Sequence, residues 1–269
     1  MLPMTVAVVQ FDPQKGEVDA NLDRAESLLA TTEADLIVLP ELFATGYFFD
    51  STEQAHALAE EVPHGATVRR MERWAKESGA VIVGGLAERD GDAVYNSAAI
   101  VTPRGWLGTY RKTHLFYEET LHFTPGDSGF RVWTVQDRRG QSYRLGAMVC
   151  FDWFFPESAR TLALKGADVI AHPSNLVLPH CPRAMPVRAL ENHIFTATAN
   201  RIGTESNGRK ELVFIGQSVI CSPGAEVLAS APEAEEAVIT AQILPHDARQ
   251  RAVNEYNDLL LDRRAELYG

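Results

Sequence analysis

Short apolar runs separated by polar turns recur along the chain, and several are followed by amphipathic segments. A short apolar run between turn residues is typical of a buried strand, whereas apolar residues spaced three or four positions apart indicate a helix. About twelve strands are predicted by the first criterion, over residues 5–10, 35–39, 80–86, 95–101, 106–110, 130–135, 143–149, 169–171, 196–200, 213–220, 226–228 and 237–243. The second criterion predicts helices over residues 21–30, 67–78, 156–165 and 185–195, and the charged tail from Asp247 has helical character.

Two pairs of these strands have the spacing of hairpins. Thr102-Pro103-Arg104-Gly105 is a turn signal between two strands, and Asp137-Arg138-Arg139-Gly140 is another. Helices alternate with strands early and late in the chain, which favours an α/β fold with mixed sheets. Because about twelve strands are too many for one typical open sheet, we expect two sheets packed face to face, each covered by helices.

Composition narrows the class of protein without identifying it. The chain has 269 residues, and no linker or low-complexity segment divides it, so we expect a single domain over residues 1–269. A formal net charge of −11 disfavours nucleic acid and anionic membranes as partners. Three widely spaced cysteines do not suggest a disulfide framework, and no apolar stretch is long enough to cross a membrane. A cytoplasmic location is therefore expected.

Cys150 is the most informative residue of the chain. It follows the apolar run 145–149 and precedes a helix that opens with Pro156. A thiol between a strand and a helix is a candidate nucleophile, because a helix N-terminus can stabilise its thiolate. The alternative for a lone cysteine is a buried, inert hydrophobic residue.

Three charged residues are candidate partners of this thiol. Glu41 comes directly after the strand at 35–39, where ligands of α/β proteins often bind, and it could act as a general base. Lys112 neighbours Arg111 in a strand pattern, so one of the two points inward, where an amine requires a paired charge. Glu119 lies among aromatic residues that could bury its carboxylate. Taken singly, each of the three is also compatible with an exposed loop or strand end.

Together these segments resemble the nitrilase superfamily of carbon–nitrogen hydrolases, in that family's order and approximate spacing. The resemblance covers almost the whole chain, and the Cys150 block is its most specific part. The matching segments are Leu39-Pro40-Glu41, Tyr110-Arg111-Lys112-Thr113-His114-Leu115-Phe116, Glu119 with Phe123-Thr124-Pro125-Gly126-Asp127, and Cys150-Phe151-Asp152-Trp153-Phe154-Phe155-Pro156-Glu157.

The resemblance implies a four-layer αββα sandwich of two mixed sheets that pairs into a dimer. It also implies a catalytic triad of Glu41, Lys112 and Cys150, with Glu119 as a second active-site glutamate. In the chemistry that these residues allow, the thiolate attacks a carbonyl or nitrile carbon and Glu41 moves the protons. Lys112 and the backbone N–H of Phe151 would then stabilise the oxyanion. No metal or organic cofactor is needed.

The residues after the nucleophile bear on the substrate. Many nitrilases carry Cys-Trp-Glu, whereas this chain has Cys150-Phe151-Asp152, closer to amidase-like members. Phe154 stands where ω-amidases usually have an arginine that anchors a carboxylate. An apolar residue there favours small neutral substrates. We therefore expect an amidase acting on small neutral amides, with Phe154 at the substrate.

Three alternatives remain open from the sequence. One is a nitrilase acting on small aliphatic nitriles, because some small nitrilases share a block like this one. The others are an N-carbamoyl amide hydrolase and a catalytically silent interaction module. For assembly we expect a homodimer or higher oligomer, with the tail from Asp247 and Leu259, Leu260 and Leu261 at the interface.

Overall fold

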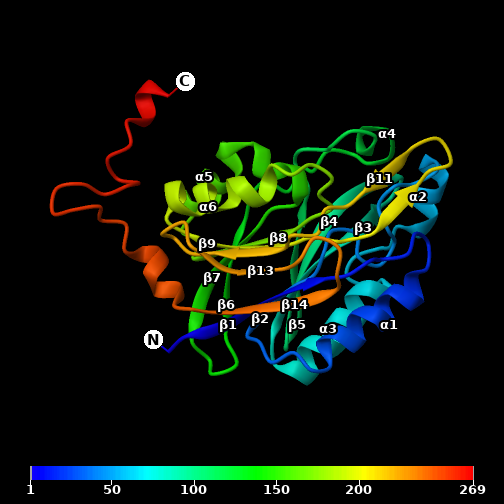
Figure 1. Cartoon of the computed structure of the whole chain (residues 1–269), viewed down its shortest axis with the longest axis horizontal. Helices are drawn as coiled ribbons and strands as arrows, with labels where there is room; N and C mark the ends of the chain where they lie inside the picture. Colours follow the sequence, from blue (N-terminus) through cyan, green and yellow to red (C-terminus); the bar gives the residue numbers. More distant parts are fainter. Residues whose placement is uncertain (1, 269) are drawn as a thin grey trace.

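The computed structural model describes residues 2–268 and contains two six-stranded sheets packed face to face (Figure 1). The first sheet has the order β14-β1-β2-β3-β4-β5 and the second β13-β12-β9-β8-β7-β6. Strands of the first sheet are β1 (Met4–Gln10), β2 (Leu36–Val38), β3 (Val81–Asp90), β4 (Ala93–Thr102), β5 (Gly105–Arg111) and β14 (Ala237–Ile243). Those of the second are β6 (Val132–Gln136), β7 (Ser142–Ala147), β8 (Val169–Pro173), β9 (Phe195–Ala199), β12 (Val219–Cys221) and β13 (Val227–Ser230).

Helices cover the outer face of each sheet, which confirms the predicted αββα sandwich. Helices α1 (Val18–Leu29) and α3 (Ala66–Ser78) cover the first sheet, and α5 (Pro156–Leu164) and α6 (Cys181–Asn192) cover the second (Figure 1). The remaining elements are α2 (Thr52–Leu58), α4 (Glu119–His122), the 3₁₀ helices η1 (Cys150–Phe154), η2 (Pro245–Arg249) and η3 (Ala265–Leu267), and the hairpin of β10 (Thr204–Ser206) and β11 (Glu211–Val213). Within residues 2–268, no helix combines the length and the apolar character needed to span a bilayer.

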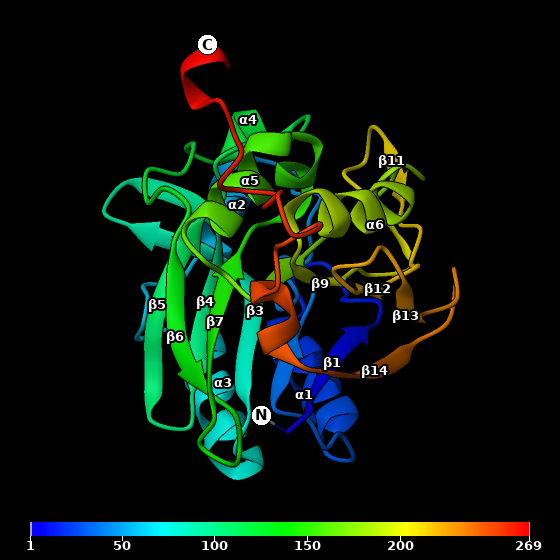
Figure 2. The ribbon, with the colours of Figure 1, turned by 90° about the vertical axis from the view of Figure 1, so that its left-hand side faces the viewer.

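Both sheets are mixed. Strands β1, β2 and β3 are parallel to one another, as are β7, β8 and β9, and the outer pairs are antiparallel. Both predicted hairpins are present, as β4–β5 and β6–β7. Figure 2 shows the edge strands β5 and β6 side by side, and Gly108 of β5 packs against Trp133 of β6.

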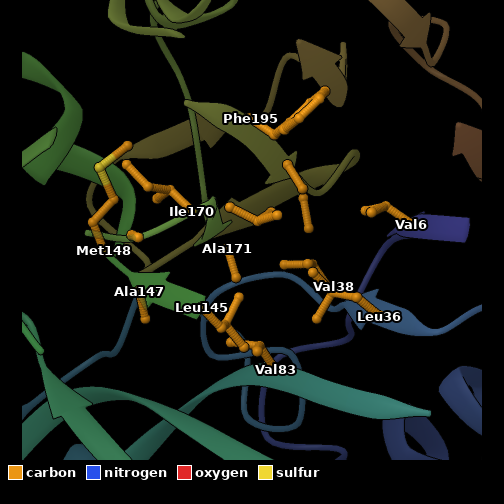
Figure 3. Close-up of a cluster of buried hydrophobic side chains, with 14 of the residues drawn as sticks. Val6, Leu36, Val38, Val83, Leu145, Ala147, Met148, Ile170, Ala171 and Phe195 are labelled. Atoms are coloured by element: carbon orange, nitrogen blue, oxygen red, sulfur yellow. The ribbon is translucent and has the colours of Figure 1, made fainter. Parts of the chain in front are cut away.

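The core between the sheets follows from the alternation of side chains along each strand. On β1, Val6 and Val8 face the inter-sheet core, whereas Ala7 and Val9 belong to the layer under α1 and α3. Figure 3 shows side chains from both sheets meeting in this core. Burial of each large aliphatic side chain contributes about 1.5–3 kcal/mol, so the inter-sheet contact holds the two halves together.

Several predicted boundaries were inaccurate for identifiable reasons. Helix α6 begins at Cys181, earlier than predicted, because Pro182 and Pro186 obscure its start in the sequence. The predicted strand over 213–220 is two separate strands, since Gly216 and Gln217 both have positive φ and turn the chain between them. Helix α2 and strand β10 were not predicted at all.

The helical character predicted for the tail from Asp247 is wrong. After η2 the tail forms turns and runs away from the two sheets to η3 (Figure 1). Asn254 and Asp258 explain the difference, because their side chains accept hydrogen bonds from backbone N–H groups two and three residues further on. Such bonds offer the backbone an alternative to the helical pattern.

Candidate active site

The candidate site lies where strands of both sheets end. Glu41 follows β2, Lys112 follows β5 directly, and Cys150 follows β7. The backbone at Glu41 packs closely against Gly85 of β3. The Gly85 N–H donates to the Pro40 carbonyl oxygen at 3.0 Å. A Cβ at position 85 would lie 2.4 Å from the Glu41 Cα, so only glycine permits this packing.

The side chain of Lys112 points inward, as the strand pattern predicted for one of two neighbours. Arg111 lies on the opposite side and pairs with Glu88 at 2.6 Å, whereas the Lys112 side chain is fully buried. Its backbone is held on both sides, since its N–H donates to Asn96 O and its carbonyl accepts from Gly126 N–H, each at 2.8 Å. Two independent contacts therefore fix the point from which the amine projects.

Lys112 brings the two predicted glutamates together. Its Nζ donates to Glu41 Oε1 and to Glu119 Oε1, both at 2.7 Å. Two residues that no sequence pattern singled out complete the cluster. Asn96 Nδ2 donates to Glu41 Oε1 at 2.6 Å, and the Tyr47 hydroxyl donates to Glu119 Oε1 at 2.6 Å. The result is a buried carboxylate–ammonium–carboxylate cluster with neutral donors on either side.

Burial and charge act in opposite directions on the pKa values of this cluster. Burial lowers the pKa of Lys112, but the charges of Glu119 and Glu41 outweigh it and raise that pKa above its ordinary value. The amine is therefore an ammonium ion. Burial raises the pKa of Glu119 to about 7, although Lys112 opposes the shift. Glu119 therefore titrates near neutral pH.

Cys150 occupies a strained position at the start of η1. Its φ is +40°, a region that residues other than glycine rarely adopt and that costs on the order of 1–3 kcal/mol. Two buried side chains stabilise the turn. His172 Nε2 donates to the Cys150 carbonyl oxygen at 2.9 Å, and Asp152 Oδ2 accepts from Val149 N–H at 2.9 Å. Burial lowers the pKa of His172 to about 4, so this imidazole is neutral.

Cys150 does not rest as the thiolate that a neighbouring helix N-terminus was expected to stabilise. Burial, followed by the charge of Glu41, raises the pKa of the Cys150 thiol well above its ordinary value. Lys112 and the backbone N–H of Asn175 oppose the shift without reversing it. The resting group is thus a neutral thiol, and a nucleophilic attack requires a base to take its proton.

Cys150 opens onto a small, largely apolar cavity of about 30 Å³. Phe151 and Phe154, which were expected at the substrate, both line it, and Phe154 is half exposed. Its other lining residues are Phe116, Trp153, Asn175, Leu176, Val177 and Leu178. All nine are uncharged or, for the thiol, neutral. Phe155 does not line the cavity and stacks on His114 instead, with ring centroids 3.7 Å apart.

Several buried polar atoms at the site have no protein partner. Both amide atoms of Asn175 are unpaired, as are Glu41 Oε2 and Asn96 Oδ1. Unpaired buried groups are rare and costly, so the presence of four such atoms at the site of Cys150 points to a ligand that would satisfy them. Among residues 2–268, no group of three or more His, Cys, Asp or Glu side chains has the arrangement of a metal site.

Comparison with known proteins identifies the family of this chain. The family described as carbon-nitrogen hydrolase matches residues 5–252. A nitrilase from Pyrococcus abyssi is 52% identical over 98% of both chains. An N-carbamoylputrescine amidase from Solanum lycopersicum is 35% identical, over 89% of this chain and 85% of the plant protein.

A solved structure of a mutant amidase from Nesterenkonia sp. AN1 has a similar fold. Its TM-score is 0.79 at 27% identity, and the match covers 98% of each chain. That structure shows the result of Michael addition of acrylamide at the active-site cysteine.

Proposed function

Since the chain belongs to the carbon–nitrogen hydrolase family, we propose that it hydrolyses small neutral amides with Cys150 as the nucleophile. One observation carries the proposal: a neutral, strained thiol opens onto an apolar cavity, and its pKa is raised by burial and influenced by the charges of Glu41, Lys112 and Glu119. The three charged groups place a general base, a cation and a second carboxylate together in one buried cluster.

The proposed reaction proceeds through a thioester. Glu41 takes the thiol proton as the Cys150 sulfur attacks the amide carbonyl carbon, and the carbonyl oxygen becomes an oxyanion. Lys112 and the Phe151 N–H stabilise that oxyanion, since the first N–H groups of a helix have no acceptor within it. Glu41 then gives the proton to the leaving nitrogen, and ammonia departs. Glu41 next activates water, which releases the carboxylic acid and regenerates the thiol.

In this scheme Glu119 orients the reacting groups rather than transferring protons. It shares the Lys112 ammonium with Glu41, and both contacts are 2.7 Å. A lysine between two carboxylates cannot swing toward either one, so its N–H groups stay aimed at the oxyanion position.

The cavity lining supports small uncharged substrates. Its walls are apolar and cannot repay the desolvation of a carboxylate. The two nearby glutamates add repulsion to any anion. At about 30 Å³, the cavity favours an aliphatic group of a few atoms over an aromatic ring unless the side chains at its rim move.

The unpaired atoms favour an amide over a nitrile. Three of the four unpaired atoms, Glu41 Oε2, Asn96 Oδ1 and Asn175 Oδ1, are acceptors and only Asn175 Nδ2 is a donor. An amide NH₂ has two hydrogens to donate to such acceptors. A nitrile nitrogen only accepts. Nitrile hydrolysis is nevertheless the second candidate, because the relative from Pyrococcus abyssi, 52% identical, is a nitrilase. The same nucleophile would then form a thioimidate.

Ammonia release from matched substrates tests the proposal. The set is propionamide, propionitrile, benzamide, succinamate and an N-carbamoyl amine, compared by kcat/KM, with Cys150→Ala as the blank. We expect propionamide to be best. A tenfold preference for propionitrile would establish the second candidate, a preference for the carbamoyl compound would assign that class instead, and succinamate as best substrate would refute the argument from the apolar wall.

A further inference from the structure

A buried arginine outside the proposed reaction, Arg201, lies just beyond the end of β9. It is 1% exposed. Its Nη2 donates to Asp12 Oδ1 at 2.7 Å and to the Pro13 carbonyl oxygen at 2.9 Å, and its Nη1 pairs with Glu205. Burying such a charge is unfavourable unless it is fully paired, so this network requires an explanation.

The network continues to the loop that follows Glu41 in the sequence. Glu205 Oε2 accepts from the backbone N–H groups of Tyr47 and Phe48, at 2.9 and 2.6 Å. A second route runs through Phe214. The Arg201 guanidinium lies 4.1 Å from the centre of the Phe214 ring, and the Tyr47 ring meets Phe214 edge to face at 5.9 Å. Backbone and side chain of Tyr47 are therefore both held from the same ion pair.

Tyr47 connects this network to the active site. Its hydroxyl donates at 2.6 Å to Glu119 Oε1, the same oxygen that accepts from Lys112. We infer that Arg201 and Glu205 are positioning residues that hold the Tyr47 hydroxyl on Glu119 and thereby keep that carboxylate ionised and aligned with Lys112. The inference rests on the proposed function, in which ionised Glu119 holds the lysine.

The charges around Glu119 explain why this donor matters. Lys112 favours its ionised form, whereas burial and the negative charge of Glu41 oppose it, and a Cys150 thiolate would oppose it as well. The hydrogen bond from Tyr47 also favours the ionised form. Burial, then the neighbouring negative charges, raises the pKa of Tyr47 well above its ordinary value, so this phenol remains a donor at working pH.

Tyr47→Phe tests the last contact alone, because the ring and its packing on Phe214 remain. We expect the acid limb of the kcat/KM profile to move up from about pH 7 by about one unit. At pH 7 the ionised fraction of Glu119 would fall from about one half to about one eleventh, so the rate should drop about fivefold. It should recover almost fully at pH 9, which general structural damage would not allow.

Glu205→Gln tests the buried pair. All three groups that bind Glu205 are donors, so a glutamine must place its NH₂ against one of them. The matched control is Asp168→Asn, since Asp168 is also buried and also binds only donors, from Arg249 and the Arg144 N–H. Both should lower the melting temperature, but only Glu205→Gln should move the acid limb, by about half a unit in the direction of Tyr47→Phe.

A second measurement does not depend on turnover. Iodoacetamide alkylation of Cys150 is followed by mass across pH 6–9. Loss of the Glu119 charge should lower the pKa of the thiol, so Tyr47→Phe should alkylate faster than wild type near pH 8. If the wild type hydrolyses none of the substrates, the proposed function fails. The alkylation rates of wild type and Tyr47→Phe then test the positioning role by themselves. If hydrolysis proceeds but Tyr47→Phe keeps the wild-type limb, or Glu205→Gln behaves like Asp168→Asn, the inference is overturned. Should Glu205→Gln not fold, Phe214→Leu replaces it under the same criteria.

Discussion

Replacing Glu119 with glutamine should make the protein more stable at alkaline pH while making it a poorer enzyme. Burial raises the pKa of Glu119 from 4.5 to about 7 in the folded chain. Between those pH values the folded state binds more protons than the unfolded state, so the free energy of unfolding falls as pH rises. A shift of that size corresponds to about 3 kcal/mol, fully lost above about pH 7.

The glutamine removes this loss because it has no proton to give up. Its Oε1 can still accept from Lys112 and from the Tyr47 hydroxyl, so the main contacts survive. We expect the stability of Glu119→Gln relative to wild type to improve by about 3 kcal/mol between pH 5 and pH 8. Activity should fall, since the lysine is then paired with one carboxylate instead of two.

Urea unfolding at pH 5, 6, 7 and 8, followed by circular dichroism, measures the difference directly. Comparing the two proteins at each pH cancels every other titrating group that they share. Parallel curves for wild type and Glu119→Gln would mean that Glu119 does not titrate in this window, and would refute the reasoning.

Four further predictions follow from the geometry. Cys150→Ala should fold and lose all ammonia release; retention of a tenth of the activity would exclude the thioester. Lys112→Met should reduce kcat more than about 10²-fold, as for loss of an oxyanion donor, and a near-wild-type rate would remove its role. Gly85→Ala should abolish activity by displacing Glu41, whereas Gly224→Ala should not, judged by kcat and melting temperature. Truncation after Asn254 should weaken the proposed dimer, as measured by sedimentation. An unchanged assembly would disprove a role for the tail.

The sequence was most informative where a strand pattern and a charge coincide. The alternation around Arg111 and Lys112 required one inward amine, and an inward amine required acids. Tyr47 and Asn96 could not be found this way, because no rule of spacing links either to a carboxylate distant in the chain. Their contacts with Glu119 and Glu41 exist only after β4, α4 and the loop after β2 converge.

The tail illustrates a different limit. Its charges have helical spacing, but local bonds from Asn254 and Asp258 favour turns. Of the leucines expected at an interface, Leu260 is buried against its own chain and Leu261 is 83% exposed. Tyr256 is 82% exposed as well. The pattern of charges alone could not show whether the tail forms a helix or turns, or which of its apolar side chains are buried.

The proposed catalytic groups are divided between the two sheets, and this division ties chemistry to the interior of the sandwich. Glu41 and Lys112 extend from the first sheet, whereas Cys150 and Asn175 extend from the second. The separation of acid and thiol is thus fixed by the thickness of the hydrophobic layer between them. A slightly looser core would leave every strand intact but would lengthen the distance between the Glu41 carboxylate and the Cys150 sulfur. The proposed proton transfer between these two groups depends on that distance. Neither sheet alone carries the complete set of proposed catalytic groups. Selection for the proposed hydrolysis is therefore also selection for a tightly packed interior.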